Sequence, residues 1–130
     1  ISLIDKDNLT YLFDRLRING VKVALNTGYS KSLQEKLIKH FNLNDKIDDY
    51  ISSSNVTIGR PYPYMIHRLS ERNNIKDMKT VAKIGDTIND MREGKNAGCG
   101  LTIGVLTGKN TKTELLNYGD IVIDKITDLL

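Results

Sequence analysis

Apolar residues near the start of the chain recur with the period of an α-helix. One face would carry positions i, i+3, i+4 and i+7, which are Leu9, Leu12, Phe13 and Leu16. Asp7 can cap this helix at its start, and Gly20 can end it in a left-handed conformation. The pattern therefore predicts an amphipathic helix between Asp7 and Gly20.

Five short, mostly apolar runs predict β-strands farther along the chain. They cover residues 21–25, 48–53, 81–85, 101–106 and 121–123. Helices are predicted between them: from about Ser30, with Leu33 and Leu37 facing inward, after Pro61, over 87–97 and over 112–118, with a last turn before Leu130. Strands that alternate with amphipathic helices indicate an α/β fold, in which helices cover both faces of a parallel sheet. We expect a three-layer, Rossmann-like domain over residues 1–130.

The composition narrows the possible partners. The chain is 39% hydrophobic and 27% charged, which is typical of a globular protein. Its net charge of +3 is mild, and no basic cluster with aromatic residues suggests nucleic-acid binding. No apolar run reaches the roughly 18 residues of a membrane helix, and no secretory signal is visible. A single cysteine, Cys99, excludes an internal disulfide and suits a cytoplasmic location.

Three predicted strands are followed by residues that suit a phosphoryl group and a metal. Thr27 and Gly28 offer a hydroxyl and a flexible backbone N–H, and Arg60 offers a cation. Asp86 follows a strand, and Asp90 lies one helical turn later. Hard cations such as Mg²⁺ take carboxylate oxygens, so Asp86 can bind the metal directly, with Asp90 as a second ligand or as the partner of a metal-bound water. Since ligands of parallel sheets bind at the carboxyl ends of the strands, the set predicts phosphoryl transfer.

Each of these residues also has a simpler interpretation. Thr27 and Gly28 can be turn residues, and Arg60 can be a solvated or surface-paired arginine. Asp86 or Thr87 can cap the next helix, because Asp and Thr favour the N-cap position and acidic first turns suit the helix dipole. The joint pattern, over three successive strand ends, favours a site.

The same residues resemble the motifs of the haloacid dehalogenase superfamily, whose members are mostly phosphohydrolases. Thr27, which ends VALNT, resembles the second motif, and Arg60 in GRPYPYM stands where the third motif has a Lys or Arg. Asp86 and Asp90 in GDTIND resemble the acidic pair of the fourth motif. The strings TGY, GRPYPYM and GDTINDMREGKNAG are most similar to phosphonoacetaldehyde hydrolase and phosphonatase-like hydrolases, and the resemblance extends from about Gly20 to the end.

The resemblance implies an Mg²⁺-dependent phosphohydrolase that acts on a small phosphorylated metabolite through an aspartyl-phosphate. Thr27, Gly28 and Arg60 would hold the phosphoryl group, and Asp86 and Asp90 the metal. The short segment after residue 104 is similar to the phosphonatase-like branch, for which cleavage of a P–C bond is not implied. Cleavage of the P–C bond of phosphonoacetaldehyde also needs a cap-domain lysine. We therefore keep it only as an alternative.

The first motif of the family, a DxDxT/V string that contains the nucleophile, has no counterpart in this sequence. Asp5 and Asp7 lie two residues apart, but no apolar strand precedes them, and we interpret them as helix-capping, solvent-facing residues. We therefore expect the C-terminal part of the core, without the first-motif strand and the cap, completed by a missing N-terminal segment or another chain.

Two non-hydrolase alternatives remain: a truncated, non-catalytic binding module, and a receiver-like phospho-acceptor domain, in which GRPYPYM would have no counterpart.

Overall fold

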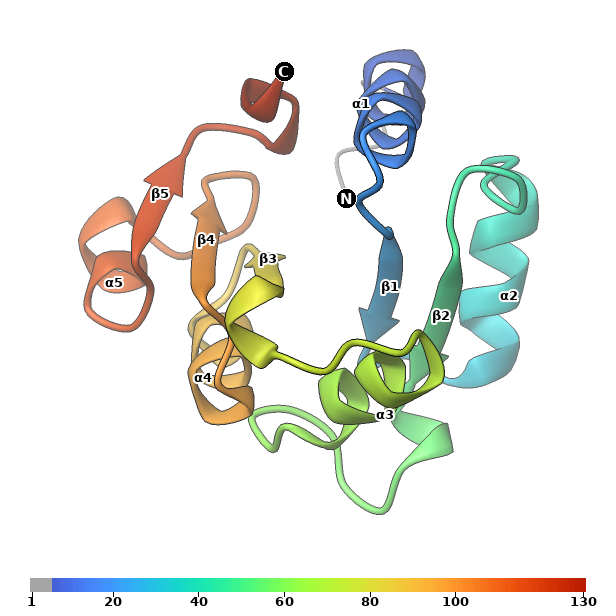
Figure 1. The fold of residues 1–130 in the computed structure, drawn as a ribbon. Helices are drawn as coiled ribbons and strands as arrows, with labels where there is room; N and C mark the ends of the chain where they lie inside the picture. Colours follow the sequence, from blue (N-terminus) through green and yellow to red (C-terminus); the bar gives the residue numbers. More distant parts are fainter. Residues whose placement is uncertain (1–5) are drawn as a thin grey trace.

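The computed structural model describes residues 6–130 and confirms the predicted α/β fold (Figure 1). The helices are α1 (Lys6–Ile18), α2 (Lys31–His40), α3 (Tyr64–Arg72), α4 (Ile88–Ala97) and α5 (Lys112–Leu116). The strands are β1 (Ala24–Thr27), β2 (Asp49–Ser52), β3 (Ala82–Gly85), β4 (Leu101–Val105) and β5 (Ile121–Ile123). Short 3₁₀ helices cover Ser53–Asn55, Met78–Thr80 and Ile126–Leu129. Within the described residues, every helix is too short or too polar to cross a membrane.

The strands form two parallel sheets instead of one. β1 pairs with β2, from Ala24 opposite Asp49 to Thr27 opposite Ser52. β3, β4 and β5 form the second sheet, with β4 in the middle. In the part of the chain that the structure describes, one edge of β1 and one edge of β3 therefore lack a strand partner (Figure 1).

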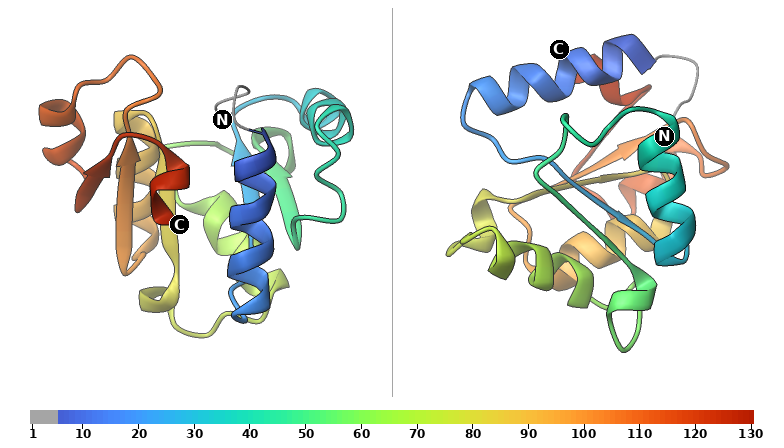
Figure 2. Two further views of the ribbon diagram at one scale, coloured as in Figure 1. Left: turned by 90° about the horizontal axis from the view of Figure 1, so that it is seen from above. Right: turned by 90° about the vertical axis from the view of Figure 1, so that its right-hand side faces the viewer.

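Helices cover both faces and connect the two sheets. On one face, α1, α2 and the segment before β2 share an apolar core, whose members are Leu9, Leu12, Phe13, Val23, Ile38, Leu43 and Ile47. The C-terminal 3₁₀ helix lies beside α1 (Figure 2) and packs Ile126 against this core. On the other face, Met65 and Leu69 of α3 pack on Ile51, and α3 contacts α4. On each face, the helices therefore extend across the boundary between the sheet of β1 and the sheet of β3.

The helix predictions are correct in place but not in every detail. Asp7 is exposed and lies within the first turn of α1, so the prediction that it caps the helix is wrong. Asp5 lies outside the described residues. Gly20 has a φ of 81°, as predicted for a left-handed helix end. In α2, Leu33 is exposed, and Gln34 takes the inward position in its place.

Strand β1 begins three residues later than predicted. Val21 is exposed, and Val23 is held by Asp48 before the strand starts. The amide of Val23 donates to Oδ2 of Asp48 at 2.8 Å, and the amide of Asp48 donates to the carbonyl of Val23 at 2.7 Å. The strand then runs on to Thr27, which was predicted to lie in the following loop.

An ion pair connects the start of β2 to the end of α3. Arg72 donates to both carboxylate oxygens of Asp49, at 2.8 and 3.0 Å, and to the carbonyl of Tyr50 at 2.8 Å. Burial alone would raise the pKa of Asp49, but hydrogen bonds from Arg72, Tyr50 and Asn73 and the charge of Arg72 outweigh burial, so the pKa lies below its usual value. The pair anchors the end of α3, the helix that follows the loop carrying Arg60.

We predict that Arg72→Met lowers the free energy of unfolding at neutral pH by about 0.5–1 kcal/mol, the upper range for a partly exposed pair. A carboxylate with a lowered pKa contributes stability above its unfolded pKa of about 3.9 and loses it as the pH falls through the folded pKa. Urea unfolding of the complete protein should therefore give a difference that is constant from pH 7 to about pH 5 and then shrinks.

The matched control is Arg92→Met, because Arg92 is exposed on α4 and makes no hydrogen bond or ion pair within the described residues. A deficit of Arg72→Met that persists unchanged into acid would contradict the assigned role of Asp49.

Candidate active site

The structure brings the predicted residues together at the carboxyl ends of β1 and β3. A Cβ atom on Gly28, just after β1, would lie 3.1 Å from a terminal nitrogen of Arg60. The other terminal nitrogen of Arg60 donates to Oδ1 of Asp90 in α4 at 2.6 Å. Arg60 therefore connects the end of β1 with the start of α4, and it is a partly buried, paired cation and not a solvated one.

The carboxylate of Asp90 is fully engaged by its surroundings. Its Oδ2 accepts hydrogen bonds from the amides of Asp86 and Thr87, both at 3.1 Å, and from the hydroxyl of Thr87 at 2.9 Å. Thr87 is the N-cap of α4, and its hydroxyl accepts from the amide of Asp90. A side chain on Gly85 would overlap Asp90, so glycine at the end of β3 permits this close packing. The helix-capping interpretation is therefore confirmed for Thr87, which is the N-cap, and not for Asp86.

Two cations face the other oxygen of Asp90. Arg60 binds Oδ1, and the ammonium of Lys83 lies 3.6 Å from the same atom. Burial alone would raise the pKa of Asp90, but the charges of Lys83 and Arg60 outweigh it, and the pKa lies below its usual value. Asp90 is thus an ionised, buried carboxylate that holds other groups in place.

Asp86 has a different environment. Its carboxylate is partly exposed and makes no hydrogen bond or ion pair with any described residue. The loop after β4 lies against it, because a Cβ on Gly108 would be 2.7 Å from Oδ2 of Asp86. A partly exposed carboxylate without a hydrogen-bond or ion-pair partner suits a hard cation. The described residues contain no group of three or more metal-binding side chains, so waters, substrate oxygens or groups outside them would complete the shell of an Mg²⁺ ion.

Thr27 and its neighbours offer hydrogen-bond donors to the same region. The hydroxyl of Thr27 accepts from the amide of Tyr29 at 3.2 Å, which leaves its own hydrogen free to donate. Ser53 donates to the carbonyl of Gly28 at 2.9 Å and fixes the loop. Gly28 is exposed, and α2 begins two residues after Tyr29 with Ser30 as its N-cap. The arrangement can bind an oxyanion at the end of β1.

Three residues close to this site were not predicted. Asn26 of β1, Lys83 of β3 and Glu93 of α4 contact one another on the side of the site that α4 covers. The sequence contained one signal, a lysine in the middle of the apolar strand VAKIG, because a charged residue in a buried strand needs a partner.

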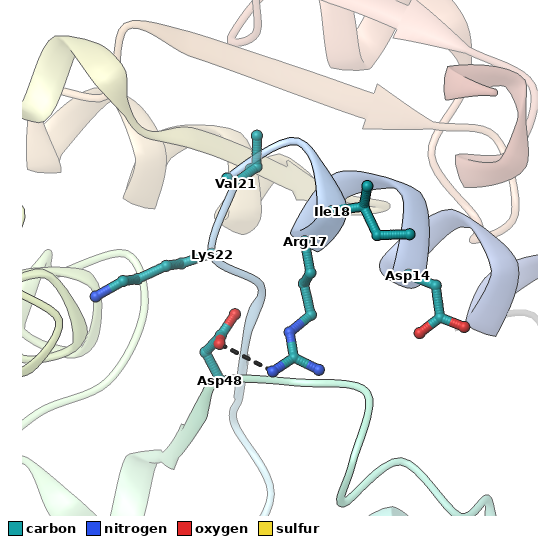
Figure 3. A pocket seen from close by; sticks show the side chains of 7 residues that line it. Asp14, Arg17, Ile18, Val21, Lys22 and Asp48 are labelled. Carbon is teal, nitrogen blue, oxygen red and sulfur yellow. Dashed lines mark hydrogen bonds and ion pairs between the residues drawn. The ribbon is translucent and has the colours of Figure 1, made fainter.

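A separate pocket of about 570 Å³ lies at the opposite end of β1. Its lining residues are Asp14, Arg17, Ile18, Gly20, Val21, Lys22 and Asp48. Arg17 binds Asp48 at 3.2 Å, and the ammonium of Lys22 points away from Arg17 (Figure 3) to donate to the carbonyl of Asn73. None of the predicted site residues lines this pocket, and its two cations already have partners.

Comparison with known sequences identifies the family. A sequence profile of the haloacid dehalogenase-like hydrolases matches residues 2–98. The chain belongs to this family. Curated relatives include a phosphonoacetaldehyde hydrolase from Bacillus cytotoxicus, 36% identical over 106 residues, which covers 81% of this chain and 38% of the relative. A phosphonoacetaldehyde hydrolase from Bacillus cereus strain B4264 is 34% identical over 105 residues, or 80% of this chain and 39% of the relative.

Solved structures of haloacid dehalogenase-like proteins have the same fold. A phosphonoacetaldehyde hydrolase-like protein from Oleispira antarctica superposes with a TM-score of 0.82 at 24% identity, over 94% of this chain and 53% of its own. A HAD-superfamily hydrolase from Ehrlichia chaffeensis gives a TM-score of 0.77 at 25% identity, over 95% and 54%. The chain thus spans about two fifths of the curated relatives' length and about half of these structures.

The two aspartates of the site should respond differently to the same substitution. Asp86→Asn is expected to weaken Mg²⁺ binding by about tenfold or more, with little effect on stability, because its carboxylate has no other partner. Asp90→Asn is expected to lower the free energy of unfolding by about 3 kcal/mol, because it leaves two cations facing a neutral amide. Calorimetric Mg²⁺ titration and urea unfolding of the complete protein measure the two effects.

Asp45→Asn is the matched control, since the side chain of Asp45 is exposed in the segment before β2. Equal losses of stability in both site variants, or Mg²⁺ binding that survives Asp86→Asn, would be inconsistent with this division of roles.

Proposed function

We propose that this chain forms part of the catalytic core of an Mg²⁺-dependent hydrolase that releases phosphate from a small phosphorus-containing metabolite. One observation carries the proposal: Asp86 presents an unpaired carboxylate beside a fully engaged Asp90, with Arg60 and Gly28 adjacent. An anionic metal ligand, a cation and N–H donors that lie close together are the groups on which phosphoryl transfer depends.

In this proposal, Thr27, Gly28 and Arg60 bind the phosphoryl group. The free hydrogen of the Thr27 hydroxyl and the N–H of Gly28 donate to phosphoryl oxygens. Arg60 uses one terminal nitrogen for Asp90 and directs the other toward Gly28, so its fork is oriented before the substrate arrives. Donors that are fixed in advance need no reorganisation during the reaction, which is why such groups accelerate it.

Asp86 would hold the Mg²⁺ ion, and Asp90 would orient the loop that carries Asp86. Bound Mg²⁺ supplies positive charge that neutralises the phosphoryl oxygens during transfer. Asp90 contributes through the amide of Asp86, which donates to its Oδ2 and so fixes the backbone of the metal ligand. In this proposal Asp90 does not bind the metal itself, because its Oδ2 already accepts three hydrogen bonds and its Oδ1 faces two cations.

The nucleophile of the proposed reaction is an aspartate on a strand outside residues 6–130, inserted between β1 and β3. Two unpaired strand edges and the partial coverage of the relatives support this arrangement. That strand would come from another segment of the complete protein or from another chain, and the aspartate would form an aspartyl-phosphate that water then hydrolyses. We assign the residues of this chain to the core and none to a cap domain, and the single Cys99 agrees with a reducing, cytoplasmic location.

Phosphonoacetaldehyde is the second candidate substrate. Two curated relatives above 30% identity carry the name phosphonoacetaldehyde hydrolase, which favours it among phosphonates. Hydrolysis of its P–C bond adds water and gives acetaldehyde and phosphate, whereas a phosphate monoester gives an alcohol and phosphate. A non-catalytic binding module would bind such ligands and release no phosphate.

A substrate panel on the complete protein tests the proposal. We expect Mg²⁺-dependent phosphate release from phosphonoacetaldehyde or from a small phosphate monoester, lowered at least about 100-fold in Asp86→Asn and unchanged in the exposed variant Asp45→Asn. Acetaldehyde in the product identifies P–C cleavage. A complete protein that binds Mg²⁺ but releases no phosphate from any member of the panel would favour the non-catalytic module.

A further inference from the structure

Three polar side chains from three elements form a closed set of contacts on the α4 side of the candidate site. The ammonium of Lys83 in β3 donates to the amide oxygen of Asn26 in β1 at 2.7 Å and lies 3.1 Å from Oε1 of Glu93 in α4. The amide nitrogen of Asn26 donates to Oε2 of Glu93 at 2.8 Å. We refer to these residues as the Asn26–Lys83–Glu93 cluster.

The cluster is buried, and its two charges depend on each other. Glu93 is 0% exposed and Lys83 8% exposed. Oε1 of Glu93 makes no hydrogen bond and is matched by the ammonium of Lys83 as an ion pair. Well-packed apolar side chains of similar volume stabilise a fold as well as a buried ion pair does, or better. Stability alone therefore does not account for a lysine and a glutamate at these two positions.

Each member of the cluster is directly connected to a residue of the site. Asn26 precedes Thr27 in β1, and Glu93 lies one helical turn after Asp90 in α4. Lys83 is 3.6 Å from Oδ1 of Asp90, the atom that also binds Arg60. Because β1 and β3 share no backbone pairing, the hydrogen bond from Lys83 to Asn26 joins the strand of Thr27 directly to the strand that ends before the acidic pair.

We propose that the Asn26–Lys83–Glu93 cluster is a positioning device for phosphoryl transfer. It fixes the distance between Thr27 on β1 and the acidic pair on β3 and α4. Lys83 also shares the charge of Asp90, which leaves one terminal nitrogen of Arg60 available to a phosphoryl oxygen. The three residues act through Thr27, Asp90 and Arg60 and do not contact the substrate. The inference rests on the proposed function, because it assigns a task to the surroundings of that same site.

The test uses Lys83→Met, Glu93→Gln and the double variant in the complete protein. Lys83→Met alone leaves a buried carboxylate unpaired and should lower the melting temperature. The double variant removes both charges together and keeps an amide beside Asn26, so it should melt within about 5 °C of the wild type. We expect its kcat to fall about tenfold or more while KM changes less than about threefold, because displaced groups weaken transition-state contacts most.

The exposed variant Arg92→Ala, on the same helix, should keep the wild-type kcat and melting temperature. A double variant that melts like the wild type and also has its kcat would overturn the inference, since the cluster would then be structural only. A double variant that does not fold would overturn it as well, by making the charges a requirement of stability. A wild-type protein without turnover contradicts the proposed function itself and removes the basis of the inference, an outcome distinct from a fully active double variant.

Discussion

The rest of this structure depends on one constraint: strands β1 and β3 each have an edge without a strand partner among the described residues. β1 bonds only to β2, and β3 only to β4, within residues 6–130. Strand edges present backbone N–H and C=O groups that need partners, which is the basis for proposing a further strand between β1 and β3. Helix packing on both faces and the side chains of the Asn26–Lys83–Glu93 cluster, not backbone hydrogen bonds, hold the two sheets in relation to each other.

The candidate site lies at the same unpaired strands. Thr27 and Gly28 lie at the end of β1, and Asp86 lies at the end of β3, so the candidate site straddles the line where the sheets do not pair. Arg60 and Asp90 cross this line through an ion pair of 2.6 Å. Two carboxylates four residues apart thus have different environments: Asp90 is ionised, buried and fully bonded, whereas Asp86 is open. Such differences between neighbouring acids allow one to organise a site and the other to bind a ligand.

Much of the fold could be predicted from local patterns. The 3.6-residue period gave α1, the alternation of strands and helices gave the parallel α/β architecture, and Gly20 marked a helix end. The start of β1 could not be predicted, because it depends on two hydrogen bonds between Val23 and Asp48, which are 25 residues apart. The inward position of Gln34 in place of Leu33 likewise depends on tertiary packing, which overrides hydrophobic period.

The candidate site shows the same division between local and distant information. Spacing and residue type predicted Thr27, Gly28, Arg60, Asp86 and Asp90 as site residues, because they lie at or beyond the ends of predicted strands and suit a phosphoryl group and a metal. The cluster beneath them was missed, since Asn26 and Glu93 are 67 residues apart and only the folded chain brings them together. Asp90 takes part in the capping box of α4 and also binds Arg60, and no sequence pattern could show that one side chain makes both contacts.

Backbone amide hydrogen exchange, measured by NMR on the complete protein, tests the central claim that a further strand lies between β1 and β3. The account predicts slow exchange for the amides of β1 that do not bond to β2 and for those of β3 that do not bond to β4, because a parallel strand would bond to both edges. Rapid exchange at these amides in the complete protein, while the amides bonded to β2 and β4 stay protected, would contradict it.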